Sequence, residues 1–198
     1  MKKLTSVSLI AFSLMSANAT IYQYDVHLNG PSESPPNASP GTGFGTVAFD
    51  DFLNTLTLSV SFSGLLGTTT ASHIHAATAS PGTGTAGVAT TTPTFAGFPL
   101  GVTSGTYNNV LDLTLASSYN PSYITAHGGT TAGAEAALAL ALASGEAYWN
   151  IHTSAFGGGE IRGFLVAVPE PSGLALLGIG GIVMAAAAGS KRRAIERT

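Results

Sequence analysis

Short stretches in which apolar and polar residues alternate recur along this chain and restrict it to a β-rich fold. Alternation with a period of two places one set of side chains on each face of an extended strand. In residues 55–63, leucine, valine and phenylalanine occupy every second position between threonines and serines. Similar patterns predict further strands at residues 21–28, 44–50 and 107–115.

Two other stretches differ from this pattern. Residues 131–144 have apolar side chains at four-residue spacing, a threonine that can cap the start and Gly145 at the end, which predicts a helix. Residues 76–105 are rich in threonine, glycine and alanine, and they predict a long surface connection with one weak strand near 87–91. Together these patterns predict an all-β fold. The expected architecture is an antiparallel, Greek-key-like β-sandwich or flattened barrel with one short helix.

Ionisable and amide side chains gather in residues 145–165, which predict two strands around a triple-glycine turn. Asn150 and His152 share one face of the first strand, and Glu160 and Arg162 share one face of the second. One interpretation is a carboxylate acid or base beside an arginine that holds an anionic substrate. The interpretation that we favour is a structural polar network that holds the last hairpin to the strand with the other histidines.

Those other histidines are His73 and His75, whose i, i+2 spacing on a strand sends both imidazoles to one side. With His152 they form a cluster that could bind copper or zinc, because neutral imidazoles are ligands for both metals. The same spacing occurs in copper-zinc superoxide dismutases, which are also β-sandwiches, although a likeness of fold says little about function. The interpretation that we favour is a hydrogen-bonded histidine cluster that needs no cofactor, and the metal site is the alternative.

Composition and charge exclude several classes of protein. The 198 residues suggest one domain plus processing segments, and the absence of cysteine rules out disulfides and sulfur redox chemistry. Residues 20–168 contain eight carboxylates and a single cation, Arg162, which gives a formal charge of −7 with histidine neutral. A surface of this charge repels phosphate, so nucleic-acid binding is excluded.

The N-terminus predicts export. Lys2 and Lys3 precede an apolar run at residues 4–15, and Ala17 and Ala19 form an A-x-A site for signal peptidase. The apolar run is shorter than the about 20 residues that cross a bilayer. We therefore expect a signal peptide at residues 1–19 and a mature domain at residues 20–167.

Three motifs carry a resemblance to a known family. They are His-Ile-His at 73–75, Ala-Tyr-Trp-Asn-Ile-His-Thr at 147–153 and Gly-Gly-Gly-Glu-Ile-Arg-Gly-Phe-Leu at 157–165. With the opening stretch at 22–49, they resemble the CHRD domain, the repeat module of the extracellular protein chordin that also occurs singly in secreted bacterial proteins. The resemblance covers residues 21–166. It implies a fold and a secreted setting, since the family has no well-established catalytic activity.

The C-terminal segment, residues 168–198, resembles a second known signal. Its three parts are Pro169-Glu170-Pro171, an apolar run at residues 172–189 and the basic cluster Lys191-Arg192-Arg193. The apolar run predicts a transmembrane helix, and the basic cluster holds its end in the cytoplasm. In this order the parts resemble the PEP-CTERM sorting signal of Gram-negative bacteria, which the membrane enzyme exosortase cuts near the PEP motif. The alternative is a permanent single-span anchor in the inner membrane.

These features together predict an exported protein at the cell surface or in an extracellular matrix. We expect a non-enzymatic binding or structural module that contacts an extracellular polymer or protein through its long loops. The alternative function is a copper- or zinc-binding protein, or an enzyme of the superoxide dismutase type, that uses His73, His75 and His152.

Overall fold

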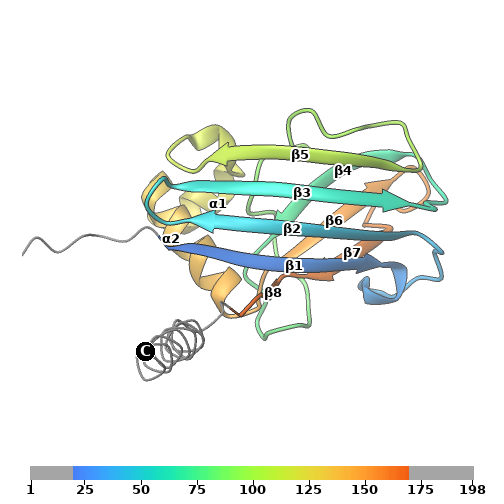
Figure 1. Ribbon diagram of the computed structural model, residues 1–198, viewed down its shortest axis with the longest axis horizontal. Coiled ribbons are helices and arrows are strands. Elements are labelled where there is room, and N and C mark those ends of the chain that lie inside the picture. Colours follow the sequence, from blue (N-terminus) through green and yellow to red (C-terminus); the bar gives the residue numbers. More distant parts are fainter. Residues whose placement is uncertain (1–19, 170–198) are drawn as a thin grey trace, which may run out of the picture.

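The computed structural model describes residues 20–169, and it shows one antiparallel sheet of eight strands with two helices at one end (Figure 1). The strands are β1 Ile21–Asn29, β2 Thr42–Asp50, β3 Thr55–Ser63, β4 Thr69–His75, β5 Gly105–Asp112, β6 Tyr148–Thr153, β7 Ile161–Phe164 and β8 Val166–Ala167. Their order in the sheet is β4-β6-β7-β1-β2-β3-β5, and β8 pairs with β1.

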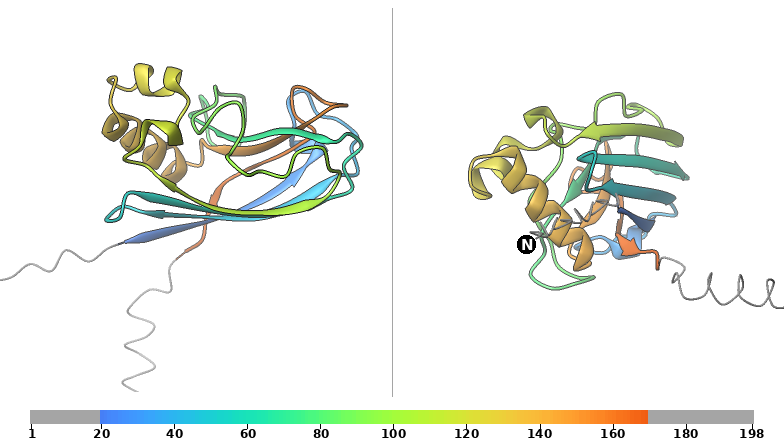
Figure 2. Two further views of the ribbon diagram at one scale, coloured as in Figure 1. Left: turned by 90° about the horizontal axis from the view of Figure 1, so that it is seen from above. Right: turned by 60° about the vertical axis from the view of Figure 1, so that its left-hand side comes forward.

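The sheet curls until its two halves face one another. In Figure 2 the half that contains β4 and β6 lies over the half that contains β1, β2, β3 and β5. The apolar positions of the alternating stretches point between the halves; Val26, Leu58, Ile74 and Trp149 are all fully buried there. This arrangement confirms the predicted antiparallel β fold, in which one curled sheet forms both layers.

The helices close one end of the core. Helix α2, Thr131–Ala143, begins at Thr130, whose hydroxyl accepts a hydrogen bond from the Gly133 amide, and it buries an apolar stripe that includes Leu138. This is the predicted helix. A second helix, α1 Pro121–Ala126, was not predicted; Asn120 caps it. Two 3₁₀ turns, Gly30–Ser32 and Ala116–Ser118, complete the regular structure of the described residues.

The long connection at residues 76–105 differs from its prediction in two respects. It contributes Phe95 and Phe98 to the core, where they are 0% and 5% exposed. In place of the weak strand near 87–91, Val88 and Thr90 form only isolated bridges. The overall composition of this segment therefore gave no sign that Phe95 and Phe98 pack into the core and hold the connection against the sheet.

Several predicted segments lie outside the described residues. They are the signal peptide with Ala17 and Ala19, and the sorting segment beyond Pro169, including Glu170, Pro171, the apolar run at 172–189 and Lys191, Arg192 and Arg193. Within residues 20–169, no helix is long and apolar enough to cross a membrane.

Candidate metal centre

The candidate site lies on the outer face of the sheet where β4, β6 and β7 run side by side. The strand register places His73 opposite Asn150, and Asn150 opposite Arg162. Because side chains alternate along a strand, Ile74 and Trp149 enter the core while their neighbours point outward. The predicted juxtaposition of the His-Ile-His strand with the last hairpin is therefore present.

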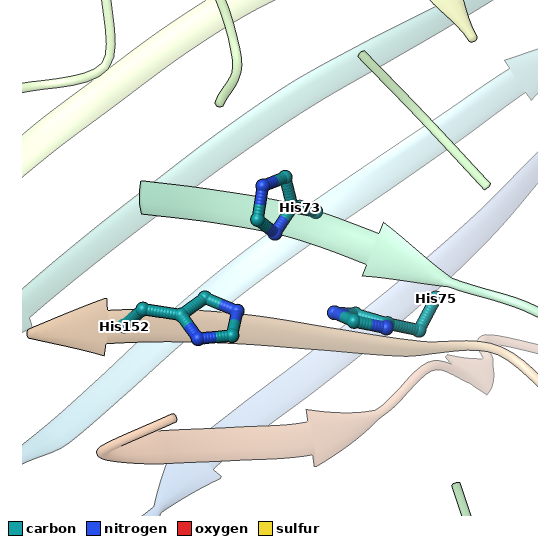
Figure 3. Close-up of side chains that lie close together, drawn as sticks. All are labelled: His73, His75 and His152. Atoms are coloured by element: carbon teal, nitrogen blue, oxygen red, sulfur yellow. The ribbon is translucent and has the colours of Figure 1, made fainter. Parts of the chain in front are cut away.

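Three imidazoles converge on this face. Figure 3 shows His73 and His75 on β4 and His152 on β6, with their rings turned toward one another. The ring centroid of His73 lies 5.1 Å from that of His152 and 5.7 Å from that of His75. Each histidine offers one ring nitrogen, and these three atoms all lie within 4.8 Å of one another. Among the described residues, the cluster contains no carboxylate or thiol ligand.

Backbone carbonyls fix one nitrogen of each ring. His73 Nε2 donates to the Pro93 carbonyl at 2.5 Å, His75 Nδ1 to Ala86 at 3.0 Å, and His152 Nδ1 to Gly157 at 3.0 Å. The remaining nitrogen of each ring is buried and has no hydrogen-bond partner. A carbonyl that binds one ring nitrogen leaves the other as a lone-pair donor, which is the usual arrangement around a metal-bound histidine.

The environment keeps these rings neutral. Burial lowers the pKa of His75 to about 4, although its bond to the Ala86 carbonyl opposes the shift. Burial also lowers the pKa of His73 and of His152. At neutral pH each ring therefore offers a lone pair without the cost of losing a proton, which is the state that metal ligation requires.

The donor set fits a transition-metal ion. Nitrogens bonded to one zinc or copper ion at about 2.0 Å would stand about 3.5 Å apart in a trigonal arrangement. Separations of up to 4.8 Å require the rings to move together by about 1 Å, which small changes in side-chain torsion allow. His73, His75 and His152 would hold the ion.

The single cation of the domain, Arg162, packs beside this cluster. Its guanidinium carbon lies 4.7 Å from the Tyr148 ring centroid, and Tyr148 stacks on His75 at 4.7 Å with an interplanar angle of 6°. Arg162 donates hydrogen bonds to the carbonyls of Ser32 and Gly84. It thus connects the last hairpin to the proline-rich turn and to the connection that covers the histidines.

The acidic partner of Arg162 is Glu33, and sequence reasoning missed this residue. Arg162 Nε lies 3.9 Å from a Glu33 carboxylate oxygen, and both side chains are buried. Asn150 also reaches this carboxylate, at 3.4 Å. Burial raises the pKa of Glu33 to about 7, although the charge of Arg162 and hydrogen bonds from Ser34 and Asn150 lower it. Glu33 lies 129 positions before Arg162 in a stretch rich in proline, so no local pattern signals the contact.

The prediction that Glu160 belongs to the same network is wrong. Its carboxylate accepts hydrogen bonds from the Ser39 and Thr153 hydroxyls and from the amides of Leu66 and Gly67. Burial alone would raise the pKa of Glu160, but these four bonds outweigh it and the pKa lies below its ordinary value. Strand β7 begins only at Ile161, and Gly159, with φ of 128°, turns the backbone just before Glu160. Glu160 therefore lies outside the regular alternation of the strand, and its side chain does not share the Arg162 face.

Comparison with known protein families supports the resemblance that the sequence carries. Residues 24–165 match the CHRD domain family. The chain belongs to the CHRD family. No curated protein and no solved structure matches it significantly. The match begins within β1 and runs through β7, and it includes the three histidines and both members of the Glu33–Arg162 pair.

The CHRD domain is followed directly by a targeting signal. Residues 167–193 match the PEP-CTERM protein-sorting motif. This signal directs the precursor to export, holds it at the membrane and exposes it to processing by exosortase. The amide of Val168 donates to the Gln23 carbonyl at 2.8 Å, so a contact with strand β1 lies next to Pro169, the first residue of the Pro-Glu-Pro stretch.

Proposed function

We propose that the mature protein is a non-enzymatic extracellular module that binds a transition-metal ion through His73, His75 and His152. The bound ion stabilises the surface formed by residues 76–105, which contacts an extracellular polymer or protein. Exosortase processing releases the module to the cell surface or to an extracellular matrix.

One observation carries the metal proposal: three neighbouring buried nitrogens lack any partner. An unpaired buried polar atom costs about 1–3 kcal/mol. Leaving three in one cluster is expensive unless a ligand satisfies them together. A single metal ion that accepts three lone pairs does so, whereas three lone pairs cannot satisfy one another.

Burial supports binding over turnover. His73 is 6% exposed and His75 is 9% exposed, because residues 76–105 cover them. A metal enzyme must leave a coordination position open to substrate. Among the best-formed clefts on the described surface, none is lined by any of the three histidines. We therefore favour a site that holds its ion under the connection over a superoxide dismutase-type centre.

The position of the ligands explains how an ion would affect the binding surface. The carbonyls of Ala86 and Pro93, which hold His75 and His73, belong to the connection. Fixing the rings on an ion also fixes these two carbonyls and the segment between them. The long connection would then present its threonines and glycines in one conformation, which lowers the entropic cost of binding a partner.

Metal analysis of the exported protein, purified without a histidine tag, tests this proposal. We expect about one equivalent of copper or zinc in the wild type and none in His75→Ala. The matched control is His27→Ala, which removes an exposed histidine from β1 and should leave the metal content unchanged. A metal-free wild type that also binds no added copper or zinc would contradict the metal proposal. Efficient dismutation of superoxide by the loaded protein would contradict its non-enzymatic part.

Mass spectrometry of the same material tests the location. The secreted form should begin near Thr20 and end near Pro169. A mature protein that retains Lys191, Arg192 and Arg193 would show that the apolar segment is a permanent anchor.

A further inference from the structure

The charge around the histidine cluster distinguishes between candidate ions, given that the site binds a metal as proposed. The cluster offers three neutral nitrogens and, within the described chain, no anionic ligand. Zinc and copper(II) would each bring two positive charges into this buried layer. The energetic cost of burying an ion rises with the square of its charge, so a cage of neutral donors favours a monovalent ion over a divalent one on electrostatic grounds.

The neighbouring side chains add to this effect. Arg162 already places a positive charge on the same face, and its guanidinium is separated from His75 by the Tyr148 ring. The Glu33 carboxylate pairs with this arginine, with one oxygen 3.9 Å from Nε, and it accepts a hydrogen bond from Asn150. This acid carries at most one negative charge against the positive charge of the arginine, so the pair supplies no net negative charge for an ion at the histidines.

The number of donors points in the same direction. Structural zinc sites have four protein ligands, and copper(II) prefers four donors in a tetragonal plane. Here three imidazoles converge, His73 and His75 are buried and His152 is half-buried, and no fourth protein ligand from the described residues joins them. Copper(I), unlike copper(II), has no ligand-field preference, and three donors satisfy it.

We propose that the site formed by His73, His75 and His152 is a three-coordinate copper(I) site. It binds copper that arrives already reduced, and no electron transfer is required. The inference rests on the proposed metal-binding function and adds the identity and oxidation state of the ion.

Competition under anaerobic conditions tests this assignment. The tag-free exported protein is titrated with copper(I) against the chromophoric chelator bicinchoninate, and separately with zinc and with copper(II). We expect one equivalent of copper(I) to be bound and to resist a 100-fold excess of zinc. Copper(II) added without a reductant should bind more weakly than copper(I).

Two ligand variants and one control locate the site. His152→Gln and His75→Ala should each lower copper(I) affinity by about 100-fold or more, whereas the exposed His27→Ala should not change it. His152 is the least buried of the three, so this variant is expected to stay folded if His75→Ala does not. Circular dichroism of each variant checks the fold.

The outcomes separate this inference from the function on which it rests. Zinc or copper(II) bound more tightly than copper(I), and lost in His152→Gln, would overturn the copper(I) assignment and leave the metal-binding function intact. Binding of none of the three ions would overturn both. Copper(I) binding that both ligand variants retain would place the ion elsewhere and also overturn the assignment.

Discussion

Two buried polar groups flank the last hairpin of this CHRD domain, and they differ in how completely their hydrogen bonds are made. On one side, the Glu160 carboxylate is 0% exposed and accepts four hydrogen bonds, with lengths from 2.6 to 3.1 Å. On the other side, His73, His75 and His152 each keep one buried nitrogen without a partner. Both groups contribute to one small region, yet only the first is complete in itself.

The difference supports the proposal that the first group serves the fold and the second serves a ligand. A satisfied buried carboxylate ties together segments that are distant in the sequence, here the turn at Ser39, the loop at Leu66 and strand β6. Unpaired buried nitrogens weaken the fold by themselves, so this cluster points to a ligand that completes it. In the described chain, five of the seven unpartnered buried side-chain atoms lie on the histidine face: Glu33 Oε1, His73 Nδ1, His75 Nε2, Asn150 Oδ1 and His152 Nε2.

The largest effect should follow from breaking the satisfied group. Glu160→Gln places an amide NH₂ where one carboxylate oxygen accepts two hydrogen bonds, so two charge-assisted bonds are lost and at least one donor is left facing another. We expect the free energy of unfolding to fall by about 3–5 kcal/mol. Urea denaturation measures this loss, and the folded fraction should retain its metal affinity. A loss below about 1 kcal/mol would show that the carboxylate is not a structural anchor.

A smaller loss is expected at the boundary between the two groups. Arg162→Ala removes the donors to Ser32 and Gly84 and leaves Glu33 without its cation. Breaking a buried ion pair costs about 3–5 kcal/mol. Here Glu33 can take up a proton, because burial raises its pKa to about 7, so we expect the lower part of that range or slightly less.

Thermal melts of Arg162→Ala and of the double variant Arg162→Ala, Glu33→Gln measure this cost. They separate the loss of the arginine hydrogen bonds from the cost of leaving the Glu33 carboxylate unpaired. The double variant should recover part of the lost stability, because it carries no unpaired acid. An unchanged melting temperature in the single variant would show that Arg162 is not structural.

The smallest effect concerns the pH dependence of the empty histidine cluster. A histidine whose folded pKa is depressed binds fewer protons in the native state than in the unfolded state. Its contribution to stability is complete above the unfolded pKa of about 6.5 and is lost as the pH falls toward the folded value, about 4 for His75. Glu33 acts in the opposite sense, because its raised pKa gives stability below about 4.5 that is lost as the pH rises through about 7.

Unfolding free energies of the metal-free protein between pH 4.5 and 7.5 test this prediction. Two proteins are compared: the Glu33→Gln variant, which keeps all three histidines, and the double variant that also carries His75→Gln. The free energy of unfolding should fall more steeply on acidification in the first than in the second. The difference in slope should approach about 1.4 kcal/mol per pH unit, the value for one proton. Equal slopes would mean that His75 titrates alike in both states.

Local patterns were sufficient for most of the fold. The strands at 21–28, 44–50 and 55–63 were predicted within a few residues because each buries every second side chain, and α2 because its apolar spacing has a cap and a terminating glycine. Helix α1 was missed because its six residues owe their order to Asn120 and to burial of Tyr123 against the core. A helix of this length has no periodic signature of its own.

The site was predictable in part for a related reason. The spacing of His73 and His75, and the strand that carries His152, were enough to place the three rings on one side. The sequence could not show that residues 76–105 supply the Ala86 and Pro93 carbonyls that fix two of the rings. It also could not show that Gly159 interrupts the alternation before Glu160. A Cβ atom at position 159 would lie 2.7 Å from a Glu33 oxygen, so this turn requires glycine.

X-ray absorption spectroscopy of the metal-loaded exported protein tests the central claim most directly, because it reports the ligands themselves. We predict a first shell of three nitrogen neighbours at about 2.0 Å, with the multiple-scattering pattern of imidazole, that loses one imidazole in His152→Gln. A first shell made mainly of carboxylate or water oxygen would contradict the account, as would an imidazole shell that is unchanged in the variant.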